Sequence, residues 1–260
     1  MKQQFAIISF LALVLVSSMP KPVKILMAGD STMADKVLMK TVVDSLTGRQ
    51  FQEPFMERGW GQLLPEFVNQ KAVVKNYAQN GRSTRTFIEE GLWTNLINNT
   101  EKGDFVIIQF GHNDSSKDKG ERYTNPAQFR INFVAFVNEV KLKGATPILC
   151  TPVARRKFDG NGQLISTHGI YPDIIRQVAK QYDVPLIDME KLTSQWLQQE
   201  GVEASKKYFH KFPPGVSKLY PQGLDDNTHF NELGAKIVAA MFVNEVKNKH
   251  INGLMSFIKQ

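Results

Sequence analysis

The stretch Val23-Lys24-Ile25-Leu26-Met27-Ala28-Gly29-Asp30-Ser31-Thr32 is the part of the sequence that best indicates the fold. Large and β-branched apolar residues dominate residues 23–28 without a helical period, which is typical of a buried strand in a parallel sheet. Gly29 allows a sharp turn and a close approach of the backbone to a ligand. Ser31 would then lie at the carboxyl edge of the sheet, where open α/β folds bind ligands. Taken alone, the stretch also fits a strand-to-helix turn in which Asp30 or Ser31 caps a helix.

Further strand-like runs follow this stretch, with helical patterns between them. The predicted strands comprise residues 23–28, 72–77, 105–110, 146–151 and 184–188. The predicted helices comprise residues 62–69, 86–97, 126–143, 170–181 and 231–247. Because strands and helices alternate, the sequence predicts a mostly parallel sheet with helices on both faces. We therefore expect a three-layer α/β/α fold whose five-stranded parallel sheet has the flavodoxin-like order 2-1-3-4-5.

Three long segments are predicted to be loops, namely residues 33–58, 154–169 and 202–224. Long loops on a rigid scaffold commonly form the walls or lids of functional sites. We expect all three to project from the sheet edge that carries Ser31.

The first residues have the pattern of a secretory signal peptide. A short positive start is followed by an unbroken apolar run from Phe5 to Val16 and by the small residues Ser17 and Ser18. We predict that residues 1–18 are a signal peptide and that residues 19–260 form a single domain; an uncleaved membrane anchor is the alternative. Export without disulfides indicates a bacterial protein of the periplasm or the extracellular space, because Cys150 is the only cysteine. Its apolar surroundings predict a buried core thiol.

The formal net charge of the chain is +7 at pH 7, which favours acidic partners. No nucleic-acid-binding motif occurs, and export argues against nucleic acid as a partner. No later apolar run is long enough to cross a bilayer, so we expect no stable membrane insertion after signal cleavage. A solvated basic surface and weak attraction to a uronic-acid polymer both fit the remaining charge.

Three further motifs make the first stretch informative. Asn80-Gly81-Arg82-Ser83 follows the second predicted strand, Gly111-His112-Asn113-Asp114 follows the third, and Asp226-Asn227-Thr228-His229 opens the last predicted helix. Each motif alone fits a polar turn or a helix cap. Together with Ser31 they bring a hydroxyl, an acid and a base to one edge of the sheet, which favours a catalytic site.

These residue types suit nucleophilic catalysis. Ser31 is the candidate nucleophile, His229 the base that takes its proton, and Asp226 the carboxylate that holds the imidazole in the required tautomer. The candidate oxyanion donors are the backbone N–H of Ser31, the backbone N–H of Gly81 and the side-chain amide of Asn113. No Gly-x-Ser-x-Gly elbow occurs, so a standard α/β-hydrolase is excluded.

With these motifs the chain resembles the SGNH subgroup of the GDSL-type esterases over about residues 23–245. The four residues that give the subgroup its name correspond here to Ser31, Gly81, Asn113 and His229. The chain is most similar to rhamnogalacturonan acetylesterases, in which the stretches Gly29-Asp30-Ser31-Thr32-Met33-Ala34 and Gly59-Trp60-Gly61 have counterparts. Thr32 stands where the wider group usually has leucine. The resemblance implies a Ser31–His229–Asp226 mechanism without a cofactor, and removal of acetyl groups from pectic rhamnogalacturonan.

Four more residues are candidates for substrate binding. Arg155 and Arg156 can hold a galacturonate carboxylate, although a solvated pair fits equally well. Trp60 fits either the core or a sugar platform, and His112 either orients the loop of Asn113 or takes a direct part. We predict no metal site, because the spacings of the histidines match no usual ligand pattern.

The leading hypothesis is therefore a secreted carbohydrate esterase that removes O-acetyl groups from a plant cell-wall polysaccharide. The alternatives are an esterase acting on acetylxylan, another glycan or a small ester, an acyltransferase that excludes water, and a non-catalytic glycan-binding relative.

Overall fold

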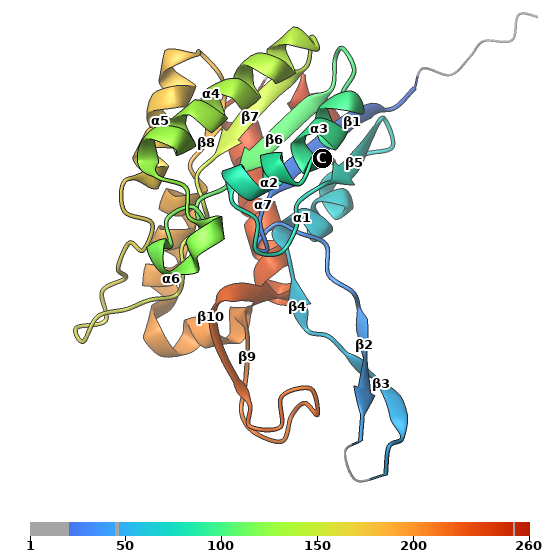
Figure 1. Ribbon diagram of the computed structural model, residues 1–260, viewed down its shortest axis with the longest axis vertical. Coiled ribbons are helices and arrows are strands. Elements are labelled where there is room, and N and C mark those ends of the chain that lie inside the picture. The colour runs from blue at the N-terminus through green and yellow to red at the C-terminus, as the bar shows by residue number, and fades with distance from the viewer. Residues whose placement is uncertain (1–20, 45–46, 252) are drawn as a thin grey trace, which may run out of the picture.

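A five-stranded parallel sheet forms the centre of the protein (Figure 1). The computed structural model describes residues 21–44, 47–251 and 253–260, so the predicted signal peptide lies outside the described residues. The strands are β1 (Val23–Gly29), β5 (Ala72–Asn76), β6 (Phe105–Gln109), β7 (Thr146–Cys150) and β8 (Leu186–Ile187). Their spatial order is β5-β1-β6-β7-β8 and all neighbours pair in parallel. This is the predicted order 2-1-3-4-5, and the α/β fold is confirmed.

Helices cover both faces of this sheet. They are α1 (Trp60–Leu63), α2 (Thr84–Glu89), α3 (Leu92–Asn98), α4 (Pro126–Leu142), α5 (Tyr171–Gln181), α6 (Met189–Ala204) and α7 (Glu232–Asn248). Short 3₁₀ turns add η1 (Leu64–Phe67), η2 (Lys117–Arg122), η3 (Ser205–Tyr208) and η4 (Leu254–Phe257). Within the described ranges, no helix combines the length and the apolar character needed to span a bilayer.

The two cores follow from the alternation of side chains along each strand. Ile25 and Met27 of β1 belong to the core under α1, α6 and α7, whereas Leu26 and Ala28 belong to the core under α2 to α5. Apolar residues on both faces explain why β1 is a continuous apolar run without alternation. The sheet is therefore buried on both sides, and ligands can reach it only at an edge.

Two predicted helices differ from those observed. Residues 86–97 form two helices, α2 and α3, because Gly91 between them adopts the left-handed conformation with φ of 73° and ends the first helix. Residues 62–69 form only the short α1 and the 3₁₀ turn η1. Helix α6 was not predicted at all; Asp188 caps its start by accepting a hydrogen bond from the backbone N–H of Lys191.

Two of the three predicted loops contain strands, which corrects the sequence-based interpretation. Residues 33–58 include the hairpin of β2 (Met39–Val43) and β3 (Gln50–Pro54), which extends away from the body of the protein in Figure 1, and the short strand β4 (Glu57–Arg58). Residues 202–224 include η3 and β9 (Phe209–Phe212). The strands β4 and β9 flank β10 (Leu224–Asn231) in a second, three-stranded antiparallel sheet.

Candidate active site

A cleft of about 330 Å³ lies at the carboxyl edge of the central sheet. Because β5, β1, β6 and β7 are neighbours in the sheet, the loops that follow them all reach this cleft. The residues predicted from sequence that line it are Ser31, Gly81, His112, Asn113, Arg155 and His229. The remaining lining residues are Glu57, Asn80, Lys119, Arg122 and Thr228.

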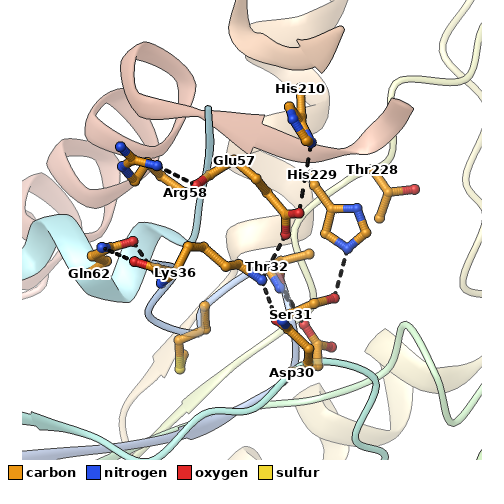
Figure 2. A network of polar contacts seen from close by, with 12 residues as sticks. Asp30, Ser31, Thr32, Lys36, Glu57, Arg58, Gln62, His210, Thr228 and His229 are labelled. Atoms are coloured by element: carbon orange, nitrogen blue, oxygen red, sulfur yellow. Dashed lines mark hydrogen bonds and ion pairs between the residues drawn. The ribbon is translucent and has the colours of Figure 1, made fainter. Parts of the chain in front are cut away.

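Ser31, His229 and Asp226 form a continuous chain of hydrogen-bond contacts. The Nε2 atom of His229 lies 2.8 Å from Oγ of Ser31, and its Nδ1 atom lies 2.7 Å from Oδ2 of Asp226. Figure 2 shows the imidazole of His229 directed at Ser31. With the proton on Nδ1 donated to Asp226, Nε2 can accept the hydroxyl proton of Ser31, which is the arrangement that activates a serine.

The sequence suggested that the candidate acid Asp226 and the candidate base His229 lie on the first turn of a helix. In the structure they lie on a strand. Both belong to β10, whose pairing with β9 changes register between Asp225 and Phe230. Oδ1 of Asp226 accepts hydrogen bonds from the backbone N–H groups of Thr228 (2.7 Å) and His229 (3.0 Å). These bonds fold the irregular segment back on itself, so a spacing of three residues still places the two side chains together.

The pKa of Asp226 reflects this environment. Burial by itself would raise the pKa, but the hydrogen bond and the charge of His229, together with the two backbone N–H groups, bring it to about 2. Asp226 is therefore ionised at neutral pH and can stabilise a positive charge that develops on His229.

A buried chain of side chains supports the turn that carries Ser31. Oδ1 of Asp30 accepts hydrogen bonds from the backbone N–H (3.0 Å) and the hydroxyl (2.7 Å) of Thr32. The hydroxyl oxygen of Thr32 in turn accepts a bond from Gln109, and the Oε1 atom of Gln109 accepts one from the indole of Trp60. Trp60 is fully buried, so of its two predicted roles the structure supports the core and not the sugar platform.

The three candidate oxyanion donors belong to residues that line the cleft, namely Ser31, Gly81 and Asn113. The backbone N–H groups of Ser31 and Gly81 donate to no other residue within the described ranges. Gly81 has φ of 76°, a conformation that glycine adopts without strain, and the side chain of Arg122 lies next to the position that a Cβ atom would take. One amide hydrogen of Asn113 is donated to the carbonyl of Arg82 at 3.0 Å, which orients the amide and leaves its second hydrogen for a ligand.

Asp114 links the two loops that carry these donors. It is fully buried, and its Oδ1 atom accepts hydrogen bonds from the backbone N–H (2.9 Å) and the hydroxyl (2.6 Å) of Thr84, just after the Gly81 loop. Burial raises the pKa of Asp114 to about 7, although the bonds from Thr84 oppose this shift. The carboxyl group of Asp114 does not line the cleft, so we interpret it as a structural group that holds the two loops together.

His112 lies beside Asn113 and forms a buried pair with His168. Nδ1 of His112 lies 3.0 Å from Nε2 of His168, and the rings meet edge to face. Burial and the neighbouring positive charges lower the pKa of both imidazoles, that of His168 to about 3, so both are neutral. Arg155 donates to the carbonyl of His112 (2.9 Å) and to the hydroxyl of Thr167 (3.1 Å), and it fixes this pair against the cleft.

Arg156 does not line the cleft, so the structure does not support a substrate contact for this residue. Its side chain is buried and donates to Oγ of Ser205 (2.9 Å) and to Oδ1 of Asn227 (2.6 Å). Its backbone N–H also donates to the carbonyl of Asn227. Arg156 thus connects the loop after β7 to β10, the strand that carries Asp226 and His229.

Sequence reasoning missed a buried ion pair next to the cleft. Lys36, whose side chain is 1% exposed, forms an ion pair of 2.7 Å with Glu57 and donates to the side chain of Asn80. The imidazole of His210 faces the same carboxylate at 3.7 Å (Figure 2). Because Asn80 precedes Gly81, this network anchors the loop of a candidate oxyanion donor. The only sequence signal that could have pointed to this ion pair is the position of Glu57 just before the motif Gly59-Trp60-Gly61.

Two other predictions concern the cysteine and the spacing of the histidines. Cys150 is buried as expected, and burial raises the pKa of its thiol. Among the residues that the structure describes, no group of three or more His, Cys, Asp or Glu side chains could hold a metal ion.

A flavodoxin-like sheet with a serine after its first strand, and an acid and a base near the C-terminal helix, defines an ester hydrolase of the SGNH type. Comparison of sequences agrees: the chain belongs to the GDSL-like lipase/acylhydrolase family, whose profile matches residues 25–242.

The chain is also similar to several named proteins. The chain is 36% identical to the rhamnogalacturonan acetylesterase RhgT of Bacillus subtilis over 88% of this chain and 91% of that protein. It is 32% identical to the probable rhamnogalacturonan acetylesterase YesY of the same organism, over 91% and 98% of the two chains. The crystal structure of YxiM from Bacillus subtilis covers 90% of this chain, with a TM-score of 0.70 and 26% identity, and the match spans 58% of the YxiM chain.

Proposed function

We propose that this protein is a carbohydrate acetylesterase that removes O-acetyl groups from a plant cell-wall polysaccharide, most specifically pectic rhamnogalacturonan. The observation that carries the proposal is the hydrogen-bonded chain from Ser31 through His229 to Asp226, which opens on a polar cleft. The relatives named as rhamnogalacturonan acetylesterases, which match nearly the whole chain, support this choice of substrate.

In the proposed reaction, the Oγ atom of Ser31 attacks the acetyl carbonyl carbon while His229 accepts its proton. The ionised Asp226 stabilises the imidazolium that forms. The developing oxyanion accepts hydrogen bonds from the backbone N–H groups of Ser31 and Gly81 and from the amide of Asn113. Collapse of this intermediate transfers the proton from His229 to the sugar oxygen, which leaves as a hydroxyl group.

The hydroxyl oxygen of Ser31 then carries the acetyl group as an ester, which is the acyl-enzyme intermediate. Water enters, gives a proton to His229 and attacks the acetyl carbon through the same oxyanion site. Acetic acid leaves as His229 returns its proton to the hydroxyl of Ser31, and it then loses its own proton to water as acetate. The buried chain from Asp30 to Trp60 holds Ser31 in place through both steps.

We also propose that the protein is exported to the periplasm or the extracellular space. The charged start and apolar run of residues 1–18 support removal of this segment as a signal peptide, with residues 19–260 forming one catalytic domain.

The test of the proposed function is acetate release by protein recovered from the export pathway of a bacterial host. Acetylated rhamnogalacturonan, acetylated xylan and an aryl acetate serve as substrates, and we expect the highest kcat/KM on rhamnogalacturonan. Ser31→Ala and His229→Ala should each lose about a thousandfold or more of the turnover on every substrate. Ser256→Ala removes a hydroxyl outside the cleft and serves as the control. Full activity of Ser31→Ala on any of these esters would exclude the mechanism.

A further inference from the structure

The charges that line the cleft are unbalanced. Lys119, Arg122 and Arg155 contribute three cations, while Glu57 is the single carboxylate among the described lining residues. Glu57 already forms its ion pair with Lys36 at 2.7 Å. The cleft beside Ser31 therefore carries an excess of positive charge that no lining carboxylate neutralises.

The three cations are not equivalent. Arg155 is engaged, because it donates to the backbone of His112 and to Thr167. Lys119 and Arg122 are exposed, and neither side chain makes a hydrogen bond or an ion pair with another residue in the described part of the chain. Both belong to η2, a charged turn that follows the loop of Asn113 directly. Two donors without protein partners thus face the cleft from one element.

The cations also repel one another. Although much of the Lys119 side chain is exposed, its pKa is lowered, first by partial loss of solvent around the ammonium and then by the charges of Arg155 and Arg122, whereas Asp118 and Asp30 partly offset this effect. Bound carboxylate would relieve this repulsion, as it would supply the negative charge that the cleft lacks.

The position of Arg122 places this charge close to the reacting ester. A Cβ atom built on Gly81 would lie 3.0 Å from both Cζ and Nη1 of Arg122, so the guanidinium packs directly over the backbone of a proposed oxyanion donor. A guanidinium presents a planar set of donors that matches a carboxylate in two parallel hydrogen bonds, and an ammonium adds a compact charge beside it.

We propose that Lys119 and Arg122 form a carboxylate-binding subsite that selects acetylated substrates with a uronate carboxylate near the scissile ester. This inference rests on the proposed ester hydrolysis at Ser31. It assigns the recognition of acid groups to the turn η2, and not to the pair Arg155 and Arg156 that the sequence suggested.

The first experiment measures binding without requiring that the polymer be a substrate. Unacetylated oligogalacturonate is titrated as a competitive inhibitor of aryl acetate hydrolysis. For Lys119→Ala/Arg122→Ala we expect the inhibition constant to rise about tenfold or more, which corresponds to about 1.4 kcal/mol. Lys117→Ala is the matched control, since Lys117 lies on the same turn, is exposed and does not line the cleft. An inhibition constant that is the same in wild type and double variant overturns the subsite.

Single variants of Arg122 and a salt titration distinguish binding at the subsite from nonspecific attraction of the acidic inhibitor. Arg122→Lys keeps the charge but loses the planar donor set, so its inhibition constant should lie between those of wild type and Arg122→Ala. Added salt should weaken inhibition of the wild type more than that of the double variant. Equal salt dependence in both proteins would mean that the inhibitor binds elsewhere.

The second experiment uses acetylated rhamnogalacturonan before and after reduction of its carboxyl groups to alcohols. The wild type should prefer the acidic form, and the double variant should lose this preference. If the wild type instead releases more acetate from xylan than from either form, the proposed substrate is wrong. The inhibition experiment still decides the subsite in that case, so the two failures are distinguishable.

Discussion

At the scale of single residues, the site depends on groups whose hydrogen bonds are satisfied by their surroundings. The ionised state of Asp226 follows from His229 and from two backbone N–H groups, and the orientation of Asn113 follows from the carbonyl of Arg82. These contacts hold the candidate catalytic groups in one geometry without a bound substrate. Such preorganised donors stabilise developing charge without reorganising during the reaction.

Asn113 tests this interpretation directly. Its free amide hydrogen should bind the oxyanion and not the ground-state carbonyl, so Asn113→Ala should lower kcat about a hundredfold or more with little change in KM. Steady-state kinetics on acetylated rhamnogalacturonan and on an aryl acetate measure both constants. Asn161→Ala, in an exposed turn, is the control. A large rise in KM with kcat intact would instead make Asn113 a residue that positions the substrate.

At the scale of elements, the site is assembled by loops from neighbouring strands and by one strand from a different sheet. The loops after β5, β1 and β6 supply Gly81, Ser31 and Asn113, while β10 supplies the candidate acid Asp226 and the candidate base His229. The start of α7 directly follows β10, and Asn231 caps this helix by accepting a hydrogen bond from the backbone N–H of Gly234 (3.0 Å). The packing of α7 therefore bears on the position of His229.

Gly234 provides a prediction about this packing. Alanine normally favours a helix over glycine by about 1 kcal/mol, but a Cβ atom here would lie 2.1 Å from the carbonyl oxygen of Tyr208. We expect Gly234→Ala to lower the free energy of unfolding by about 1–3 kcal/mol, because the helix start must move. Urea denaturation measures this difference. Gly160→Ala has open space around its Cβ and should change stability by less than about 0.5 kcal/mol. Equal midpoints for the two variants would contradict this account.

At the scale of the whole molecule, the central sheet is buried on both faces, and the candidate catalytic groups gather at its carboxyl edge. Arg156 connects the loop after β7 to β10, and Asp114 connects the loop after β6 to Thr84 at the start of α2. Burial of such groups makes the stability of the whole protein depend on their ionisation.

Asp114 provides a prediction of how the stability of the protein changes with pH. Its pKa of about 7 in the folded protein is above the value of about 3.9 for an unfolded chain, so the folded state holds an extra proton between these values. The resulting contribution to stability is fully present below about pH 4 and is lost as the pH rises through about 7. Asp114→Asn keeps the acceptor for Thr84 but does not titrate. The free energy of unfolding of the wild type should therefore fall relative to that of the variant between pH 4 and pH 7.5, measured by urea denaturation. Parallel curves would contradict the raised pKa.

Much of the fold and of the candidate site could be predicted from sequence. The apolar run before Gly29 and the strands after it define a parallel sheet, because only a sheet covered on both faces needs continuous apolar strands. Ser31, Gly81 and Asn113 could be placed together, since the carboxyl ends of parallel strands share one edge. The spacing of Asp226 and His229 indicated a pair, although it suggested a helical turn in place of an irregular strand.

Other features were decided only by the tertiary structure. Arg155 and Arg156 are adjacent in sequence and similar in chemistry, yet one lines the cleft and the other is buried against Ser205 and Asn227. The second sheet and the ion pair of Lys36 with Glu57 join segments far apart in the chain, and no local pattern encodes such partners. Local periodicity reports which face of an element is apolar. Which charged side chain finds a partner and which remains free for a ligand depends on long-range packing, and the sequence alone does not contain that information in readable form.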